Sequence, residues 1–331
     1  MKESKEMKIA ILGASGTLGS CTAYAILERR LDGEMWLFGR SRERLMAHCM
    51  DLQIAAAALG EMTVHAARGY EELFGCDVVI NNAGVPTQSG RGRREMLIGN
   101  LGIVSQFAAE VRQRCPQALV ITAMNPVDSI NFAFLRLTGM GRSQLMGYCL
   151  NDTYRARMYV ARKLGICATR VDMLVVGEHG PHQTPLWSTL KVDGMPFRAT
   201  PELRAYVLEK IPKFIQELER LGTGRTAGWI SGLGMARLVN AIARDTGEVF
   251  PCSVMLDGEF GRSGFSVGVP ARIGRRGIVE VLELPLPPDE KSSLEEALDV
   301  LQNTAATVDE LLAALPRDSN TSQVALQKAD T

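Results

Sequence analysis

His179 is the strongest candidate in the chain for a group that takes up and returns a proton. It stands in the segment VGEHGP, directly after the apolar run VDMLVVG at residues 171–177. That run predicts a strand, and the glycines beside the histidine leave backbone room for a ligand at the strand's end. An imidazole titrates near neutral pH, which suits general acid–base chemistry. The sequence therefore favours His179 over the other histidines as a catalytic base.

An aspartate and an arginine stand upstream of this histidine at helical spacing. Asp152 and Arg155 fall at the start of a predicted helix over residues 152–164, so both side chains project from one face of its first turn. Each has a simpler explanation when taken alone. An aspartate at this place commonly caps a helix, and an arginine is commonly a surface cation. The pair indicates a catalytic site only because of its spacing to His179.

A glycine-rich turn follows the first apolar run and is a candidate phosphate-binding site. The run KIAIL at residues 8–12 predicts a strand, and GASGTLG at 13–19 leads from it into a helix-patterned stretch. In a dinucleotide-binding loop the first glycine permits the turn, the second lets the backbone approach the pyrophosphate, and the third allows close helix–strand packing. The helix N-terminus adds amide donors. The expected cofactor contacts here are Gly13, Ser15, Gly16, Thr17, Leu18 and Gly19.

The end of the second predicted strand carries no carboxylate. NAD-binding folds commonly place an acidic side chain there, about 20 residues beyond the glycine loop, where it binds the ribose hydroxyl. Here the run EMWLF is followed by Gly39, Arg40, Ser41 and Arg42, which can donate hydrogen bonds to a 2′-phosphate. A solvated helix start is the simpler alternative. The pattern predicts a preference for NADP(H), with NAD(H) as the second cofactor.

Strand-like runs alternate with helix-patterned stretches through the first half of the chain. The runs lie at residues 8–12, 34–38, 77–81, 118–123 and 144–148, and the helical stretches at 18–30, 42–59 and 94–114. Short buried strands that alternate with helices imply right-handed crossovers and a parallel sheet. The sequence therefore predicts an α/β fold with a doubly wound parallel sheet of the Rossmann type. Residues 1–150 are expected to form this dinucleotide-binding domain.

The second half has a different pattern, with strand-like runs divided by glycine and proline. After the strand at 171–177 the sequence predicts a loop, then helices at 201–221 and 229–243, strands at 253–258, 265–274 and 277–284, and a last helix to about residue 315. Such runs are typical of antiparallel hairpins. We therefore expect an α+β substrate domain with antiparallel strands over residues 151–315. The polar tail over 316–331 is expected to be disordered.

Composition limits the classes of function. The 331 residues carry 37 basic and 37 acidic side chains, so no basic excess indicates a nucleic-acid partner. No apolar run approaches the ~18 residues that a membrane helix needs. The seven cysteines include no Cys-x-x-Cys pair and none at metal-ligand spacing from a histidine. We therefore expect reduced thiols, no metal site, no membrane partner and a cytoplasmic protein.

Taken together, these segments resemble the lactate/malate dehydrogenase family. His179 follows Asp152 by 27 residues and Arg155 by 24. The other matching segments come in order: AGVP at 83–86, Gly90 to Arg93, Asn100, NPVD at 125–128, GEHG at 177–180 and GVP at 268–270. The similarity extends from about residue 8 to 312. The glycine loop and the FGR after the second strand are most similar to malate dehydrogenases that accept NADP.

The resemblance implies a role for each matching side chain. His179 exchanges a proton with the substrate while a hydride moves between the same carbon and the nicotinamide, and Asp152 orients the imidazole. Arg155 grips the 1-carboxylate through two parallel hydrogen bonds. Arg93, on a loop that closes over the site, polarises the carbonyl. The implied cofactor contacts are Ala83, Gly84, Asn100 and Asn125, and Asn125 is also a substrate contact.

The implied substrate is a small 2-hydroxy or 2-oxo acid, with malate and oxaloacetate as the first expectation. The position that contacts the far end of the substrate is Thr87, where malate enzymes carry an arginine and lactate enzymes a glutamine. A neutral threonine does not supply the cation that a second buried carboxylate needs. Arg91 could take that place. Lactate-like and bulkier acids therefore stay open as substrates.

Two other functions fit parts of the sequence. The glycine loop, NNAG at 81–84 and the Tyr159-x-x-x-Lys163 pair also suit a short-chain dehydrogenase, although hairpins have no place in that family. The other alternative is a dinucleotide-binding protein without turnover. The resemblance also implies a homodimer or homotetramer, with the helix over 42–59 at an interface.

Overall fold

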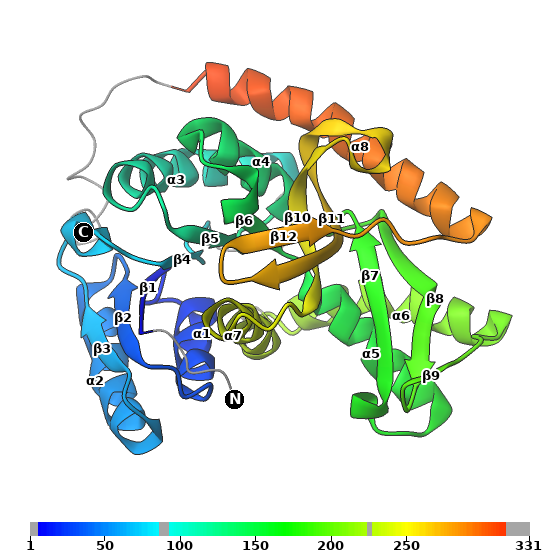
Figure 1. Ribbon diagram of the computed structural model, residues 1–331, viewed down its shortest axis with the longest axis horizontal. Helices are drawn as coiled ribbons and strands as arrows, with labels where there is room; N and C mark the ends of the chain where they lie inside the picture. The colour runs from blue at the N-terminus through cyan, green and yellow to red at the C-terminus, as the bar shows by residue number, and fades with distance from the viewer. Residues whose placement is uncertain (1–5, 86–92, 224–226, 316–331) are drawn as a thin grey trace.

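A single twelve-stranded sheet runs through the computed structural model, which describes residues 6–85, 93–223 and 227–315 (Figure 1). The six strands at one end are parallel to one another. In sheet order they are β3 (Thr63–Ala66), β2 (Gly33–Phe38), β1 (Met7–Leu12), β4 (Val78–Asn81), β5 (Leu119–Thr122) and β6 (Leu145–Tyr148).

The strand order reverses between β1 and β4. From β1 the chain moves outward to β2 and β3, and it then returns to β4 on the other side of β1. In open sheets of this kind, ligands bind at the carboxyl ends of the strands where the order reverses. The predicted doubly wound sheet is confirmed. The glycine loop, which follows β1, lies at this reversal.

Helices cover both faces of the parallel strands. In Figure 1, α3 and α4 lie on one face, and α1 and α2 lie on the other. Their bounds are α1 (Thr17–Leu27), α2 (Arg42–Leu59), α3 (Arg93–Arg114) and α4 (Val127–Thr138). Residues Ile9 to Leu12 of β1 are completely buried between these layers. Burial on both faces explains why the strand is continuously apolar rather than alternating.

The remaining strands extend the same sheet in the antiparallel sense. β10 (Val249–Asp257) pairs with β6 at Cys252 and Tyr148, and β11 (Ser263–Gly274) lies between β10 and β7. The other elements of this half are α5 (Leu150–Leu164), β7 (Val171–Gly177), β8 (Gln183–Val192), β9 (Met195–Pro196), α6 (Pro201–Arg220), α7 (Gly228–Arg244), β12 (Gly277–Val281) and α8 (Pro288–Ala313). The predicted α+β character with antiparallel strands is confirmed.

Close packing joins the two halves as well as the sheet. α7 lies against α1 (Figure 1), and a Cβ at Gly232 of α7 would be 2.8 Å from the Cys21 carbonyl of α1. One large apolar core includes side chains from both halves, among them Phe134 of α4 and Val176 of β7. A smaller core forms between α5, β7 and α6. The elements that carry the candidate site are therefore held by shared packing.

The loop predicted between the strand at 171–177 and the helix at 201–221 is only partly correct, because β8 and β9 lie within it and only residues 178–182 form a loop directly after β7. Leu186 and Leu190 of β8 are buried, which the sequence pattern does not reveal because Pro185 interrupts the run. At Pro185 the strand has only β7 as a neighbour, and such an edge position tolerates proline. β10 likewise begins at Val249, ahead of the predicted start at 253.

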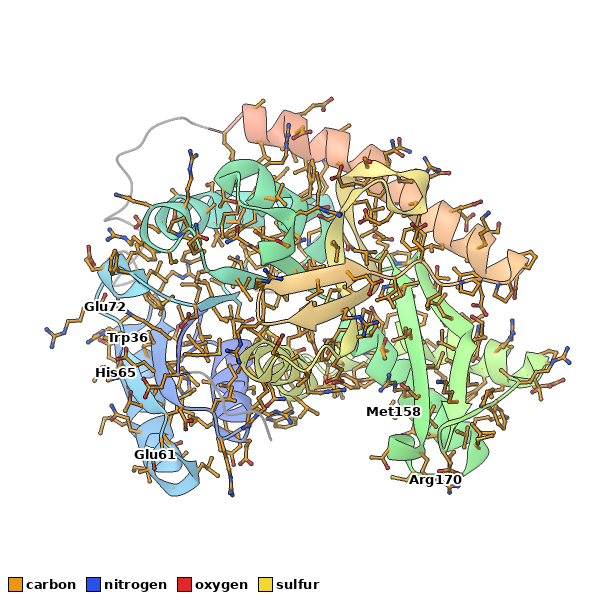
Figure 2. The ribbon with its side chains drawn as sticks, in the orientation of Figure 1. Trp36, Glu61, His65, Glu72, Met158 and Arg170 are labelled. Atoms are coloured by element: carbon orange, nitrogen blue, oxygen red, sulfur yellow. The ribbon has the colours of Figure 1, made fainter. Side chains whose placement is uncertain are left out.

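The sequence also does not predict β3 and α4. β3 is an edge strand of four residues, and its His65 stacks on Trp36 of β2 with ring centroids 4.6 Å apart (Figure 2). A run so short carries little periodicity of its own. α4 starts directly after Pro126, which stands at its N-cap. No helix in the three described ranges is long and apolar enough to cross a membrane.

Candidate active site

His179 and Asp152 meet at the junction of β7 and α5. The two are 27 residues apart in sequence, and His179 Nδ1 lies 2.6 Å from Asp152 Oδ2. The packing of α5 against β7 brings them together, and Thr153 Oγ1 accepts the Val175 amide between the two elements. Asp152 is almost completely buried. With Nδ1 bonded to the carboxylate, Nε2 is the ring nitrogen suited to proton exchange with a substrate.

Arg155 completes this cluster from the same helix turn. Its Nη1 donates to Asp152 Oδ1 at 2.8 Å, and its guanidinium lies over the ring of Phe214 in α6 at 5.1 Å. The side chain is buried, yet its Nε has no hydrogen-bond partner in the described part of the chain. Buried guanidinium donors that lack partners are costly unless a ligand satisfies them. The arrangement suits a carboxylate that binds to Arg155.

Burial and neighbouring charges set the protonation of this cluster. Burial works against the charged form of Asp152, but His179 and Arg155 outweigh it and hold the pKa of this carboxyl below its ordinary value. Burial also disfavours the imidazolium, but the Asp152 carboxylate, and then Asp128, raise the pKa of His179 above its ordinary value. Near neutral pH the site therefore combines an ionised carboxylate with an imidazole that readily holds a proton.

The glycine loop has the shape that a dinucleotide needs. Gly13 has a φ of +80°, and a Cβ there would lie 2.7 Å from the Ala83 nitrogen after β4. A Cβ at Gly19 would lie 2.4 Å from the Gly13 carbonyl oxygen, so helix and loop touch. At Gly16 a Cβ would meet only that oxygen, at 3.4 Å. The loop is thus closed toward the protein and open at Gly16, where α1 begins without a side-chain cap.

Asn100 ties together two loops at the carboxyl ends of β4 and β5. Its Oδ1 accepts the Val85 amide at 2.8 Å, and its Nδ2 donates to the Asn125 carbonyl at 2.6 Å. Gly84 lies against the same side chain, since a Cβ there would be 3.2 Å from Oδ1. Asn100 is buried, so its amide holds the two loops together, and direct contact with a cofactor stays a prediction. Asn125 is exposed.

The loop after β2 lies beside the glycine loop. A Cβ at Gly39 would be 2.6 Å from Ser15 Oγ, which explains why this strand end carries no side chain. Arg40 is exposed and Ser41 is partly exposed. Arg42 Nη1 donates to the Ala67 carbonyl at 2.8 Å, which holds that side chain toward the end of β3. Thr17 is exposed and Leu18 partly exposed at the start of α1, as cofactor contact requires.

Part of the predicted substrate loop, including Thr87 and Arg91, lies outside the described residues. Arg93 is the first residue of α3, and its side chain also falls outside the described part. Their roles stay predictions. In the described ranges no group of three or more His, Cys, Asp or Glu side chains is placed to hold a metal ion, and none of the seven cysteines forms a disulfide.

Two polar side chains near the cluster were missed as site residues. Asp128 Oδ2 accepts the His179 amide at 3.0 Å, and its only sequence mark is its place in the NPVD segment. Asn151 stands beside Asp152. Its Nδ2 donates to Ser231 Oγ at 2.8 Å, and its Oδ1 accepts the Tyr148 hydroxyl at 2.9 Å. Asn151 therefore anchors α5 to α7.

The Tyr159–Lys163 pair does not form a second site. Tyr159 is buried in the smaller core and meets Tyr206 of α6 edge-on at 6.2 Å. The Lys163 amine lies 5.3 Å above the ring of the same Tyr206. Both side chains thus pack α5 against α6. The short-chain alternative is therefore wrong.

Two family models match the chain one after the other. The first is described as the lactate/malate dehydrogenase NAD binding domain and matches residues 7–147. The second is described as the lactate/malate dehydrogenase alpha/beta C-terminal domain and matches residues 151–312. Together they cover both halves of the sheet and every element of the cluster.

Individual proteins give the same result. A malate dehydrogenase of Nitratiruptor sp. is 32% identical over 311 residues, which cover 91% of this chain and 98% of that one. Among solved structures, Cryptosporidium parvum malate dehydrogenase has a TM-score of 0.87 at 28% identity and covers 92% of this chain and 100% of its own. A lactate dehydrogenase of the same organism, complexed with lactic acid and nicotinamide adenine dinucleotide, has a TM-score of 0.85 at 27% identity, over 94% and 99%.

Proposed function

The chain belongs to the lactate/malate dehydrogenase family, and we propose that it transfers a hydride between NADP(H) and malate or oxaloacetate. The coarser activity, that of a malate/lactate dehydrogenase-type oxidoreductase, follows from the family. The observation that carries the proposal is the buried cluster of His179, Asp152 and Arg155. In this proposal residues 1–150 hold the cofactor, residues 151–315 hold the acid, and the enzyme works in the cytoplasm.

His179 is the proton donor and acceptor in this mechanism. The bound nicotinamide supplies or receives the hydride at the carbon that carries the substrate oxygen. In the reducing direction protonated His179 gives its Nε2 proton to the 2-oxo oxygen, and the product is the 2-hydroxy acid. In the oxidising direction the neutral imidazole takes that proton back. Asp152 holds Nδ1, so the ring keeps the orientation and tautomer that both directions need.

Arg155 orients the acid. The substrate's 1-carboxylate accepts hydrogen bonds from the guanidinium, whose Nε lacks a partner among the described residues. Phe214 lies against the guanidinium and restrains it, while Asp152 bonds only Nη1. A planar guanidinium can bind a carboxylate through two parallel bonds, which a lysine cannot do. We assign Asn125 to the substrate oxygen or the cofactor, and Arg93, at the start of α3, to the carbonyl.

The cofactor preference rests on the loop after β2. Gly39 leaves no room for an acidic side chain next to Ser15, and Arg40 and Ser41 stand exposed beside it. A 2′-phosphate would find donors there instead of a repelling carboxylate. The first family model describes an NAD-binding domain, so NAD(H) stays the alternative. Arg40→Ala should lower kcat/KM with NADPH by about 10-fold, because one charge-assisted contact is lost, and leave kcat/KM with NADH unchanged.

Malate and oxaloacetate are proposed because several relatives carry the name malate dehydrogenase. The second candidate is a lactate-like or bulkier acid. It is favoured by neutral Thr87 and by the similarity to a lactate dehydrogenase complexed with lactic acid. Arg91 is the residue we assign to a second substrate carboxylate.

A panel of 2-oxo acids, with and without a second carboxylate, tests the assignment when each acid is assayed with NADPH and with NADH. The proposal predicts the highest kcat/KM for oxaloacetate with NADPH. The highest value for a monocarboxylic acid would favour the second candidate. No turnover with any acid of the panel would overturn both.

We also propose that the enzyme is a homodimer or homotetramer that uses α2. Met50 is 62% exposed and Ile54 is 73% exposed on this helix, and Trp229 of the neighbouring α7 is 72% exposed. Tyr24 of α1 and Trp229 line one groove between α1, α2 and α7, whereas Met50 lines a second groove between α2 and the strands β2 and β3. Exposed apolar surface of this kind favours association. Light scattering of Met50→Glu should show a smaller particle than the wild type, and an unchanged mass would contradict the assignment.

A further inference from the structure

Asp128 is a buried carboxylate beside His179, and the proposed mechanism gives this carboxylate no role. It lies in the first turn of α4 and is 2% exposed. Its Oδ2 accepts the His179 amide at 3.0 Å across 51 residues of sequence. Its Oδ1 has no hydrogen-bond partner in the described ranges. The Ser253 hydroxyl lies close enough to favour the charged form of this carboxyl, so the carboxylate has one hydrogen bond and one nearby hydroxyl.

We propose that Asp128 is a positioning residue for His179, which it fixes through the main-chain amide and favours in the protonated state through its negative charge. Asp152 and Asp128 would then share the stabilisation of the imidazolium, one from α5 and the other from α4. This inference rests on the proposed role of His179 as the proton donor.

The charged groups around His179 support a shared stabilisation of the imidazolium by Asp152 and Asp128. Asp152 and Arg155 face it from α5, Asp128 faces it from α4, and Glu178 precedes it and accepts the His182 amide. Burial lowers the pKa of His179, Asp152 and then Asp128 raise it, and Arg155 lowers it. Asp128 is therefore the second negative charge acting on the imidazole.

Asp128 is itself ionised at neutral pH. Burial raises the pKa of its carboxyl to about 6, against the opposing effects of the Ser253 hydroxyl and of His179. Glu178 adds a smaller upward effect on the same pKa. Cys149, at the N-cap of α5, stays a neutral thiol because burial raises its pKa well above the ordinary value. Asp128 is thus a charge whose field His179 feels above about pH 6 and loses below it.

Another buried carboxylate shows what a purely structural one looks like here. Glu290 in α8 is also 2% exposed, but both of its oxygens are used. Oε1 accepts the Ser188 amide at 2.8 Å, and Oε2 accepts the Ser188 hydroxyl at 2.6 Å. An amide oxygen could hold the His179 amide as well as Asp128 does. A buried charge with one hydrogen bond and one nearby hydroxyl is costly, which favours a role for the charge itself.

The test compares Asp128→Asn with Glu290→Gln, which removes a charge of equal burial elsewhere. The imidazole of His179 is titrated by NMR in histidine-labelled protein, where His179→Gln identifies its signal among four histidines. The proposal predicts that the His179 midpoint falls by about one pH unit in Asp128→Asn and stays unchanged in Glu290→Gln. An unchanged midpoint in folded Asp128→Asn would overturn it, since the asparagine oxygen can still accept the amide.

If Asp128→Asn does not fold, the NMR titration of His179 in the wild type tests the proposal instead. Its His179 signal should then show a second inflection near pH 6, from the ionisation of Asp128, and a single inflection would overturn the proposal. This titration needs no substrate, so it is separate from the proposed activity. Turnover adds a further readout. Reduction of the 2-oxo acid needs protonated His179, so its kcat/KM should begin to fall at a lower pH in Asp128→Asn, by the same shift.

Discussion

The proposed cofactor end and the candidate catalytic cluster of this enzyme differ in the kind of residue that forms them. At the cofactor end the important residues are glycines, and the distances that matter are those at which an added Cβ would collide with backbone. In the cluster the important residues are charged side chains, buried and bonded to one another at 2.6 and 2.8 Å. The first region therefore acts through shape and the second through charge. Substitutions should separate them, because shape governs binding and charge governs proton transfer.

The largest expected effect is at His179. His179→Ala should lower kcat by about 1,000-fold, which is within the range of a lost general acid–base group. The dissociation constant of NADPH, measured by fluorescence titration, should change little, since the glycine loop is untouched. A variant with near-normal turnover would show that another group moves the proton.

Arg155→Lys comes next and separates charge from geometry within the cluster. Lysine keeps the positive charge but loses the paired donors, so we expect KM for the 2-oxo acid to rise by about 100-fold. The cofactor KM serves as the internal control and should stay constant. If both KM values stayed at the wild-type level, Arg155 would not bind the substrate carboxylate.

Gly16→Ala and Gly19→Ala test the shape principle as a matched pair. A Cβ at Gly19 would lie 2.4 Å from the Gly13 oxygen, so Gly19→Ala should destabilise the fold by about 2 kcal/mol and lower the Tm. Gly16 has more room, so Gly16→Ala should keep the Tm and weaken NADPH binding by about 10-fold. Differential scanning fluorimetry and cofactor titration measure the two effects. Equal changes in Tm would contradict the assignment of the open side to Gly16.

The sequence predicts those features that depend on neighbours along the chain. The doubly wound half follows from local alternation of strands and helices, and the glycine loop from its place after β1. The spacing of Asp152, Arg155 and His179 identifies the cluster through the family resemblance. Each of these features can be recognised from residue patterns or spacings along the chain.

What the sequence does not predict depends on contacts between distant segments. Pro185 interrupts the apolar run within β8, so the sequence does not predict this strand, and only its pairing with β7 shows it. The pairing of β10 with β6 joins Cys252 to Tyr148, and no local pattern specifies it. Asp128 is marked in the sequence only by its place in the NPVD segment, because its contact with His179 exists only once the fold brings α4 to the end of β7. Side-chain burial and strand pairing determine these features, and both depend on contacts between segments that are distant in the sequence.

The measurement that tests the central claim most directly is the pH dependence of 2-oxo acid reduction in Asp152→Asn and in the wild type. Asp152 raises the pKa of His179, and reduction requires the protonated ring, so kcat/KM falls as the pH rises through that pKa. In Asp152→Asn we predict that this fall occurs at a lower pH and that kcat drops by about 100-fold or more, with NADPH binding unchanged. A variant whose profile and kcat match those of the wild type would contradict the account, because the carboxylate would then not control the histidine.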